Sequence, residues 1–433
     1  MRLRHTIRSL SEIRNFVLDE TRVRAHIMRP ENVMNIVSHP GLAGVTYRPA
    51  FDFSFQFGSY YHLDVNGFGD TLHAALQKNV SGYVMCLRQH GRTICTRQWN
   101  WAKTAIDGSE SWTPSIRMHI ASCSKLITAM ALIKVLDERQ IKDVTPIIGF
   151  LPSYWVKGPN IDQITFHQLL THTSGFNTDE SKCDFLFMQD AVSAGVGVKR
   201  IGKYKYQNMN YGLCRILLAT IIGDIAPPTT FHIPFIKDSN NLLWDYITIQ
   251  SFVRYVQEHV FGPSRVSDAT LDHPDTCALA YPFPPDAKPG WNSADLTAAL
   301  GAAGWHMTVE DLLAIMGAFR RGNSIVSPAR AQSMLDLAYG TDAWASTSTP
   351  MGFIYVKNGW WEISEIYDLL RPMVLTKKVE QSALCFMPQD MELVAFANSP
   401  AGSAQEWIVP YITSAFTANL HSRDILHHLQ RER

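Results

Sequence analysis

Short runs in which apolar and β-branched residues dominate lie toward both ends of this chain. Two of them, Gly82–Arg88 (GYVMCLR) and Arg92–Trp99 (RTICTRQW), flank His90-Gly91, a pair typical of a hairpin turn. Runs of the same kind return late in the chain, at 352–357, 381–387 and 392–397. We therefore expect strands from the two ends of the chain to pair in one sheet.

Helical periodicity dominates the middle of the chain, from about residue 121 to residue 300. One amphipathic helix is expected to begin at Ser122, with an apolar stripe made by Leu126, Met130, Val135 and Leu136. The proline-rich stretch 281–290 (YPFPPDAKPG) is expected to be a loop. A later helix is expected at Val309–Phe319, with Thr308 as its N-cap, and another at about 404–420.

Strands at both ends and helices between them predict an α+β fold, with an antiparallel sheet flanked by helices and an inserted, mostly helical region. The sheet is expected from about 75–120 and 300–420, and the helical region from about 121–300. Together they would form one domain over 46–433. Residues 1–45 are interpreted as an N-terminal extension, to which the pattern assigns no role.

Composition narrows the classes of protein that fit. Of 433 residues, 46% are hydrophobic and 18% are charged, which is enough apolar material for a sizeable core. The net charge is zero, so no electrostatic footprint for nucleic acid or an anionic membrane is expected. The sequence shows neither the apolar run of a membrane span nor the apolar core of a signal peptide, so a cytoplasmic location is the default expectation.

The cysteines and histidines do not suggest a disulfide framework or a metal site. The cysteines number seven, are scattered and form no C-x-x-C, so buried reduced thiols are expected. The 16 histidines show no H-E-x-x-H or comparable ligand spacing. We expect no metal and no cofactor.

Candidate chemistry begins at Ser122, because Ser122 and Lys125 form the only S-x-x-K match in the chain. Residues three positions apart share a helix face, so the Lys125 amine can reach the Ser122 hydroxyl and take its proton. The helix N-terminus also favours developing negative charge. Taken alone the motif is weak, because a serine at this position can be an ordinary helix cap.

Three further segments follow Ser122 in order: 164–176 (ITFHQLLTHTSGF), 206–212 (YQNMNYG) and 357–359 (KNG). With them, residues from about 75 to 420 resemble the serine hydrolases related to class C β-lactamases and penicillin-binding proteins, which include carboxylesterases and D-aminopeptidase-like enzymes. The resemblance implies a β-lactamase/transpeptidase-like fold. The sequence contains no G-x-S-x-G elbow, which argues against an α/β-hydrolase.

The resemblance also implies roles for the matched residues. Ser122 would attack an acyl carbonyl, and Lys125 or Tyr206 would accept the serine proton. The usual pKa values of lysine and tyrosine are about 10.4 and about 10, so one of them must be shifted by its surroundings. Because the two groups would titrate together, the sequence leaves open which is the base. Asn208 would hydrogen-bond Lys125 or the substrate.

In the third segment, Lys357 would place a substrate carboxylate or tune the Tyr206 phenol, and Gly359 would complete the triplet. The backbone N–H groups of Ser122 and Trp360 would hold the oxyanion. By the same resemblance, His172 and Ser174 are expected to be structural.

The third segment departs from the family triplet, which is usually K-T-G or H-x-G before a short hairpin. Asn358 occupies its middle position, and the long stretch before the next strand predicts a lengthened hairpin. The triplet at 288–290 (KPG) also fits K-x-G, but proline cannot donate to a central sheet ladder. A solvated lysine at a strand end remains the alternative for Lys357.

The sequence therefore predicts a serine hydrolase that cleaves an ester, an amide or a β-lactam through an acyl-Ser122 intermediate. Its partner would be a small-molecule or peptide substrate. The alternative is a catalytically inactive or covalently sensing β-lactamase-like protein that binds ligand or assembles without turnover, which the altered third segment supports.

Overall fold

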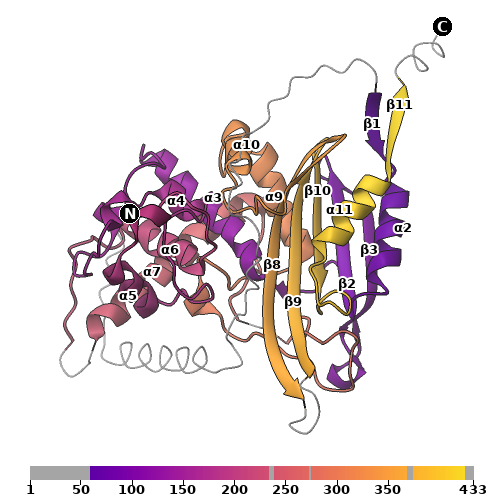
Figure 1. Ribbon diagram of the computed structural model, residues 1–433, viewed down its shortest axis with the longest axis horizontal. Coiled ribbons are helices and arrows are strands. Elements are labelled where there is room, and N and C mark those ends of the chain that lie inside the picture. Colours follow the sequence, from indigo (N-terminus) through magenta and orange to yellow (C-terminus); the bar gives the residue numbers. More distant parts are fainter. Residues whose placement is uncertain (1–58, 234–237, 273–274, 368–373, 425–433) are drawn as a thin grey trace.

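The computed structural model describes residues 59–233, 238–272, 275–367 and 374–424 (Figure 1). In this part of the chain, seven strands form a sheet of order β4-β3-β2-β10-β9-β8-β7, with antiparallel neighbours throughout. They are β2 (Gly82–Gln89), β3 (Arg92–Lys103), β4 (Glu110–Ser111), β7 (Thr347–Thr349), β8 (Gly352–Tyr367), β9 (Val374–Met387) and β10 (Met391–Ala397). The extension expected at 1–45 lies outside the described residues.

The β2–β10 pairing joins the two ends of the chain, because Val84 of β2 lies opposite Phe396 of β10. The strands predicted around residues 82–99 and in the last hundred residues are thus neighbours in one sheet, and the α+β class is confirmed. A separate two-stranded ribbon pairs β1 (Ser59–Leu63) with β11 (Leu420–Asp424).

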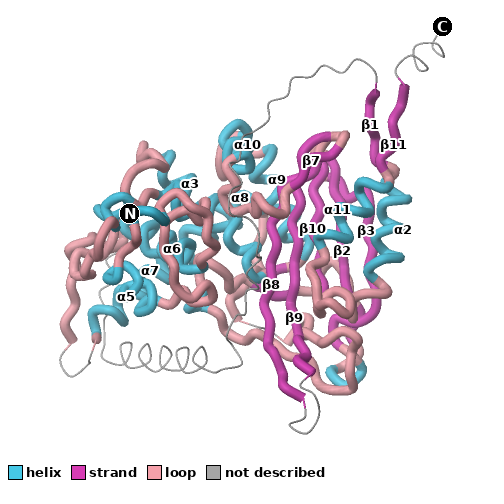
Figure 2. Tube along the Cα trace, viewed as in Figure 1, coloured by secondary structure: helices cyan, strands magenta, loops and turns pink. Residues whose placement is uncertain are grey.

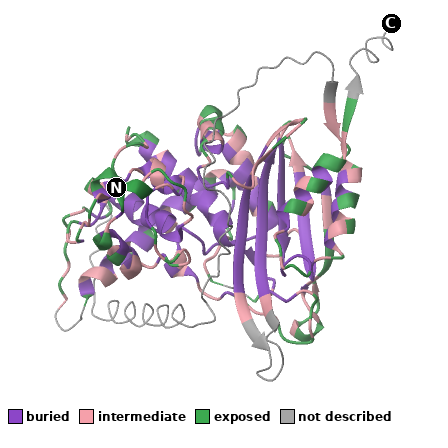
Figure 3. Cartoon of the chain, viewed as in Figure 1, coloured by how far each residue is buried: buried purple, intermediate pink, exposed green. Residues whose placement is uncertain are grey.

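The sheet is covered on both faces, as the period of two along β2 shows. Tyr83, Met85 and Leu87 belong to a core cluster shared with α2 and α11, whereas Val84 and Cys86 belong to the larger cluster shared with the central helices. The covering helices on the first face are α2 (Val65–Leu76) and α11 (Val409–Ala418). Figure 3 shows the strands between the two layers buried over most of their length.

The other layer consists mainly of helices, which Figure 2 shows gathered beside the sheet. It contains α3 (Ser124–Glu138), α4 (Phe166–Leu170), α5 (Phe185–Ala194), α6 (Asn208–Ile222), α7 (Ser239–Val256), α8 (Gly262–Ser264), α9 (Val309–Arg321) and α10 (Pro328–Asp336). Two short strands, β5 (Met118–His119) and β6 (His306–Met307), pair antiparallel at the sequence borders of the inserted helices α3 to α8.

Helix α9 confirms the prediction made from its sequence. Thr308 and Asp311 form a reciprocal capping box at its N-terminus, in which each side chain accepts a hydrogen bond from the other residue's backbone N–H. The box satisfies two amide groups that the helix leaves without intrahelical partners.

Two helix predictions are corrected. Ser122 lies in a 3₁₀ turn, Ala121–Cys123, and α3 begins at Ser124. The sequence predicted one buried apolar stripe on this helix. In the structure α3 is buried on nearly all sides, as the central helix of its layer. The last helix begins at Val409 rather than near 404, with Pro410 in its first turn, where a missing N–H costs nothing.

The lengthened hairpin predicted after the third segment is confirmed. Strands β8 and β9 pair from Tyr355 opposite Phe386 out to Tyr367 opposite Val374. All seven cysteines lie in the described residues, where they are buried and unbridged. Among the described helices, none has both the length and the hydrophobicity needed to cross a membrane.

Candidate active site

Ser122 lies on the turn that leads into α3, and the backbone presents it in an unusual way. Ala121 has φ of +48°, a left-handed conformation that residues with a Cβ rarely adopt and that clusters at functional sites. The turn is held from both sides, since Ile120 N–H donates to Trp305 O (2.9 Å) and Ile120 O accepts from Ser382 Oγ (2.8 Å). The Ser122 hydroxyl is therefore held at a fixed place at the start of a buried helix.

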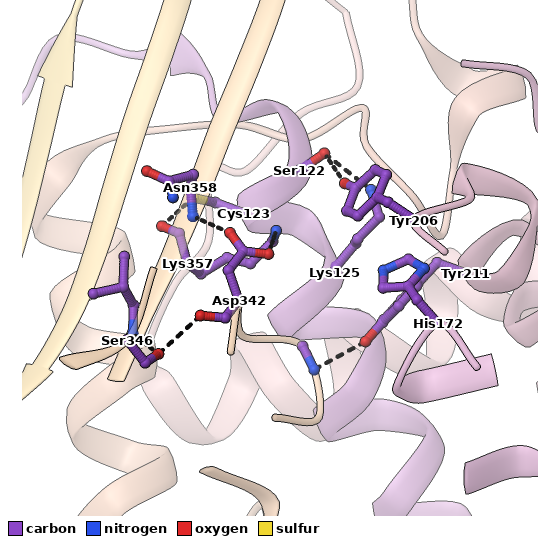
Figure 4. A network of polar contacts seen from close by, with 12 residues as sticks. Ser122, Cys123, Lys125, His172, Tyr206, Tyr211, Asp342, Ser346, Lys357 and Asn358 are labelled. Atoms are coloured by element: carbon purple, nitrogen blue, oxygen red, sulfur yellow. Dashed lines mark hydrogen bonds and ion pairs between the residues drawn. The ribbon is translucent and has the colours of Figure 1, made fainter. Parts of the chain in front are cut away.

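Lys125 reaches back to this hydroxyl from the first turn of α3 (Figure 4). Its Nζ lies 2.9 Å from Ser122 Oγ, 2.7 Å from Asn208 Oδ1 and 2.9 Å from the carbonyl oxygen of Ala302. Lys125 is almost fully buried, so these three oxygens replace its hydration.

Tyr206 arrives at Ser122 from a distant segment, just before α6. Its phenolic oxygen lies 2.7 Å from Ser122 Oγ, while Lys125 Nζ lies 5.0 Å from the centre of its ring. The imidazole ring of His172 stacks on the Tyr206 ring, with 4.4 Å between the ring centres. The predicted residues Ser122, Lys125, Tyr206 and Asn208 are therefore brought together by the fold.

Burial favours the uncharged forms of both candidate bases. It lowers the pKa of Lys125 well below the usual lysine value, and the charge of Lys357 lowers it further. Burial also raises the pKa of Tyr206 well above the usual tyrosine value, with the charge of Asp342 adding to the effect. A neutral Lys125 amine can donate its two hydrogens to Asn208 and Ala302 and keep its lone pair for the Ser122 hydroxyl.

Lys357 lies on β8 near the same group but has a partner that the sequence analysis missed. Its Nζ lies 2.7 Å from Asp342 Oδ1 and 5.6 Å from the centre of the Tyr206 ring. Asp342 Oδ2 accepts the backbone N–H of Asn358 (2.8 Å). Lys357 is buried, so the alternative of a solvated strand-end lysine is wrong.

Gly359 and Trp360 bring β8 against the serine turn. A Cβ at Gly359 would lie 2.3 Å from Ile120 O and 2.2 Å from Ser382 Oγ, so this strand position needs glycine. Trp360 is buried beside it, and its indole N–H donates to Glu362 (2.6 Å). The indole of Trp360 therefore makes a structural contact. Its backbone comes directly after Gly359, the residue that packs on the serine turn.

His172 and Ser174 lie behind the site and hold it. His172 Nδ1 accepts from Gln207 N–H (3.2 Å), and Ser174 Oγ donates to Asn210 Oδ1 (2.7 Å). Burial lowers the pKa of His172 well below the usual histidine value, so the ring stacked on Tyr206 is neutral. These contacts agree with the structural interpretation of both residues.

Two contributors to the site could not be found from sequence motifs. The Ala302 carbonyl is a backbone group, which no residue type signals. Asp342 lies in an irregular stretch after α10, two positions after Gly340, which takes a left-handed φ of +78°. A glycine shortly before an acidic residue is the one signal that was present, and it is a weak one.

Comparisons with known proteins show what this chain is similar to. Residues 68–224 match the family model described as Beta-lactamase. PbpX of Bacillus subtilis (strain 168), provisionally named a penicillin-binding protein, is 22% identical over 241 residues, which cover 54% of this chain and 53% of PbpX. The chain spans about half or less of the length of the curated relatives that it matches.

Solved structures share the fold over most of the chain. FmtA from Staphylococcus aureus superposes with a TM-score of 0.56 at 13% identity, covering 82% of this chain and 87% of FmtA. EstCE1, described as a hydrolase with promiscuous acyltransferase activity, gives a TM-score of 0.56 at 16% identity over 81% of this chain and 99% of its own. At these identities the likeness establishes the β-lactamase/transpeptidase-like fold.

Proposed function

Because this chain is related to the β-lactamase and penicillin-binding-protein family, we propose that it is a serine hydrolase with Ser122 as nucleophile. One observation carries the proposal. Ser122 Oγ lies 2.9 Å from the Lys125 amine and 2.7 Å from the Tyr206 phenol, two groups that burial keeps uncharged. A hydroxyl beside a neutral amine can lose its proton as it attacks.

In the proposed acylation, Ser122 Oγ bonds to the acyl carbon while its proton passes to Lys125 Nζ. The backbone N–H groups of Ser122 and Trp360 would hold the resulting oxyanion. When the tetrahedral intermediate collapses, the bond to the leaving group breaks, the leaving oxygen or nitrogen takes the proton of the Tyr206 phenol, and Lys125 Nζ returns its extra proton to the phenolate. Water then attacks the acyl-Ser122 ester and gives a proton to Lys125 Nζ. The bond between the acyl carbon and Ser122 Oγ breaks, the acid leaves, and Ser122 Oγ takes that proton back.

The bond cleaved would be an ester, an amide or a β-lactam. EstCE1, which is described as a hydrolase and an acyltransferase, shares the fold, and both activities pass through an activated acyl group. We take ester hydrolysis as the reaction to test first, because an ester is the least demanding of the three acyl donors.

The test is active-site labelling of the unmodified chain. A fluorophosphonate should add once per molecule, and peptide mass mapping should place the adduct on Ser122 rather than on Ser124. A p-nitrophenyl ester should then be hydrolysed with steady turnover, and prior labelling should abolish that turnover. Absence of an adduct, or an adduct elsewhere, would contradict the proposal.

A second candidate is a covalent sensor that acylates without turnover. It is favoured by the pairing of Lys357 with Asp342, which leaves the third segment without an uncompensated cation. A burst of p-nitrophenol equal to one molecule per chain, with no steady phase, would identify this alternative.

The lowered pKa of Lys125 predicts how the rate depends on pH. Below this pKa the amine is an ammonium and cannot accept the Ser122 proton, so acylation should be slow. As pH rises through the pKa the rate should climb to a plateau, and the climb should finish well below the usual lysine value of about 10.4. The measurement is kcat/KM for an uncharged ester between pH 5 and 10; a rate that falls with rising pH across this range would contradict Lys125 as the base.

A further inference from the structure

We propose that this site selects uncharged acyl groups and discriminates against substrates whose acyl group carries a carboxylate. The inference rests on the proposed hydrolase function and adds the substrate class. Its basis is the ion pair between Lys357 and Asp342, which cancels the charge of the cation nearest to Tyr206 after Lys125.

The pair is built to stay closed. The Lys357 and Asp342 side chains are only 3% and 5% exposed, and their charged atoms lie 2.7 Å apart. Asp342 is held at its second oxygen by the backbone N–H of Asn358 (2.8 Å), so it is tied to the strand that carries Lys357. Figure 4 shows Lys357 and Asp342 side by side, near Ser122, Lys125 and Tyr206. Water cannot take the place of either partner at this burial.

Lys377, on the strand next to β8, is also balanced by a buried carboxylate, since it lies 3.0 Å from Glu362. Lys125 is deeply buried, and its pKa is lowered well below the usual lysine value. Lys357, Lys377 and Lys125 thus lack a free positive charge for an incoming anion. Lys205, which precedes Tyr206, is 39% exposed and lies 3.8 Å from Glu180, so its charge is shared with solvent.

A substrate carboxylate near Ser122 therefore has two unfavourable choices. It can remain unpaired in a partly dry site, or it can compete with Asp342 for Lys357 and leave Asp342 without its partner. An uncharged acyl chain meets neither cost. The carboxylate of Asp342 also repels a second anion directly.

The experiment compares two esters of matched length, p-nitrophenyl heptanoate and mono-p-nitrophenyl adipate, which differ by a terminal ethyl group in place of a carboxylate. For the unmodified chain, kcat/KM for the heptanoate should exceed that for the adipate by at least about tenfold. Equal values, or a preference for the adipate, would overturn this inference and leave the hydrolase proposal standing. If neither ester is hydrolysed, both proposals fail.

Asp342→Asn provides the second arm. It removes the negative charge while an amide oxygen remains for the Asn358 N–H, so Lys357 becomes available to a substrate carboxylate. The heptanoate-to-adipate ratio should fall by about tenfold or more, and the exposed Asp190→Asn control should keep the original ratio. A folded Asp342→Asn protein with an unchanged ratio would overturn the inference. Should that variant not fold, the ratio measured on the unmodified chain still decides.

Discussion

Replacing Ser122 by alanine is expected to lower kcat for ester hydrolysis by about four orders of magnitude or more. The change removes the atom that would carry the acyl group. Lys125 Nζ is held behind the hydroxyl by Asn208 and Ala302, and burial keeps the Tyr206 phenol protonated, so neither group is placed to attack in its stead. Steady-state hydrolysis of p-nitrophenyl heptanoate measures kcat, and fluorophosphonate labelling reports whether any nucleophile remains.

Ser124→Ala is the matched control for this loss. Ser124 is buried and lies two positions after Ser122, and its replacement by alanine removes the same single oxygen from the same helix start. The Ser124 side chain is not among the contacts of Lys125 or Tyr206. We expect Ser124→Ala to keep kcat within about threefold. Equal losses in the two variants would indicate damage to α3 rather than loss of a nucleophile, and full activity in Ser122→Ala would exclude Ser122 from the chemistry.

The sequence predicted those parts of the molecule that follow from local rules. The spacing of Ser122 and Lys125 determines their contact because both lie within one helical turn. The capping box at Thr308 and the hairpin at residues 82–99 are equally local. Period-two burial along β2 could also be expected, since a strand covered on both faces packs alternate side chains into two clusters.

Contacts between distant segments needed more than spacing. Tyr206 and Asn208 were placed at the site by resemblance, because spacing alone does not fix the distance between Ser122 and Tyr206, which are 84 positions apart. The partner of Lys357 was missed for the same reason. Asp342 meets Lys357 only because the irregular stretch after α10 returns to β8, and the conformation of such a stretch depends on tertiary packing.

The missed carboxylate changes the interpretation of the third segment. From the sequence, Lys357 was a cation available to a substrate carboxylate or to Tyr206. In the structure its charge is balanced by Asp342. Burial raises the pKa of Tyr206 well above the usual tyrosine value, and the negative charge of Asp342 adds to this, so the phenol stays protonated. The phenol is then suited to donate a proton to a leaving group, while Lys125 is suited to accept one from Ser122.

Gly359 explains why the strand lies so close to the serine turn, and it gives the second prediction with a large effect. A Cβ at this position would lie 2.3 Å from the backbone oxygen of Ile120, closer than real contacts allow. Ser382 Oγ, at 2.2 Å, could rotate away, but the Ile120 carbonyl belongs to the chain that enters the Ser122 turn. Gly359→Ala must therefore push β8 and the turn apart.

We expect Gly359→Ala to lower the free energy of unfolding by about 3 kcal/mol, as an overpacked core position does. It should also lower kcat about a hundredfold, because a shift of about 1 Å separates the Ser122 hydroxyl from the Trp360 N–H across the proposed oxyanion site. Urea unfolding and steady-state kinetics on p-nitrophenyl heptanoate measure the two effects.

Gly197→Ala is the control that separates this clash from the general cost of replacing a glycine. Gly197 has φ of −76°, which alanine adopts freely, and a Cβ there would meet no atom within 4 Å. Its stability should stay within about 0.5 kcal/mol of the unmodified chain, with unchanged kcat. If Gly359→Ala behaves like this control, β8 does not bear on the serine turn, and Trp360 cannot contribute its N–H to an oxyanion at Ser122.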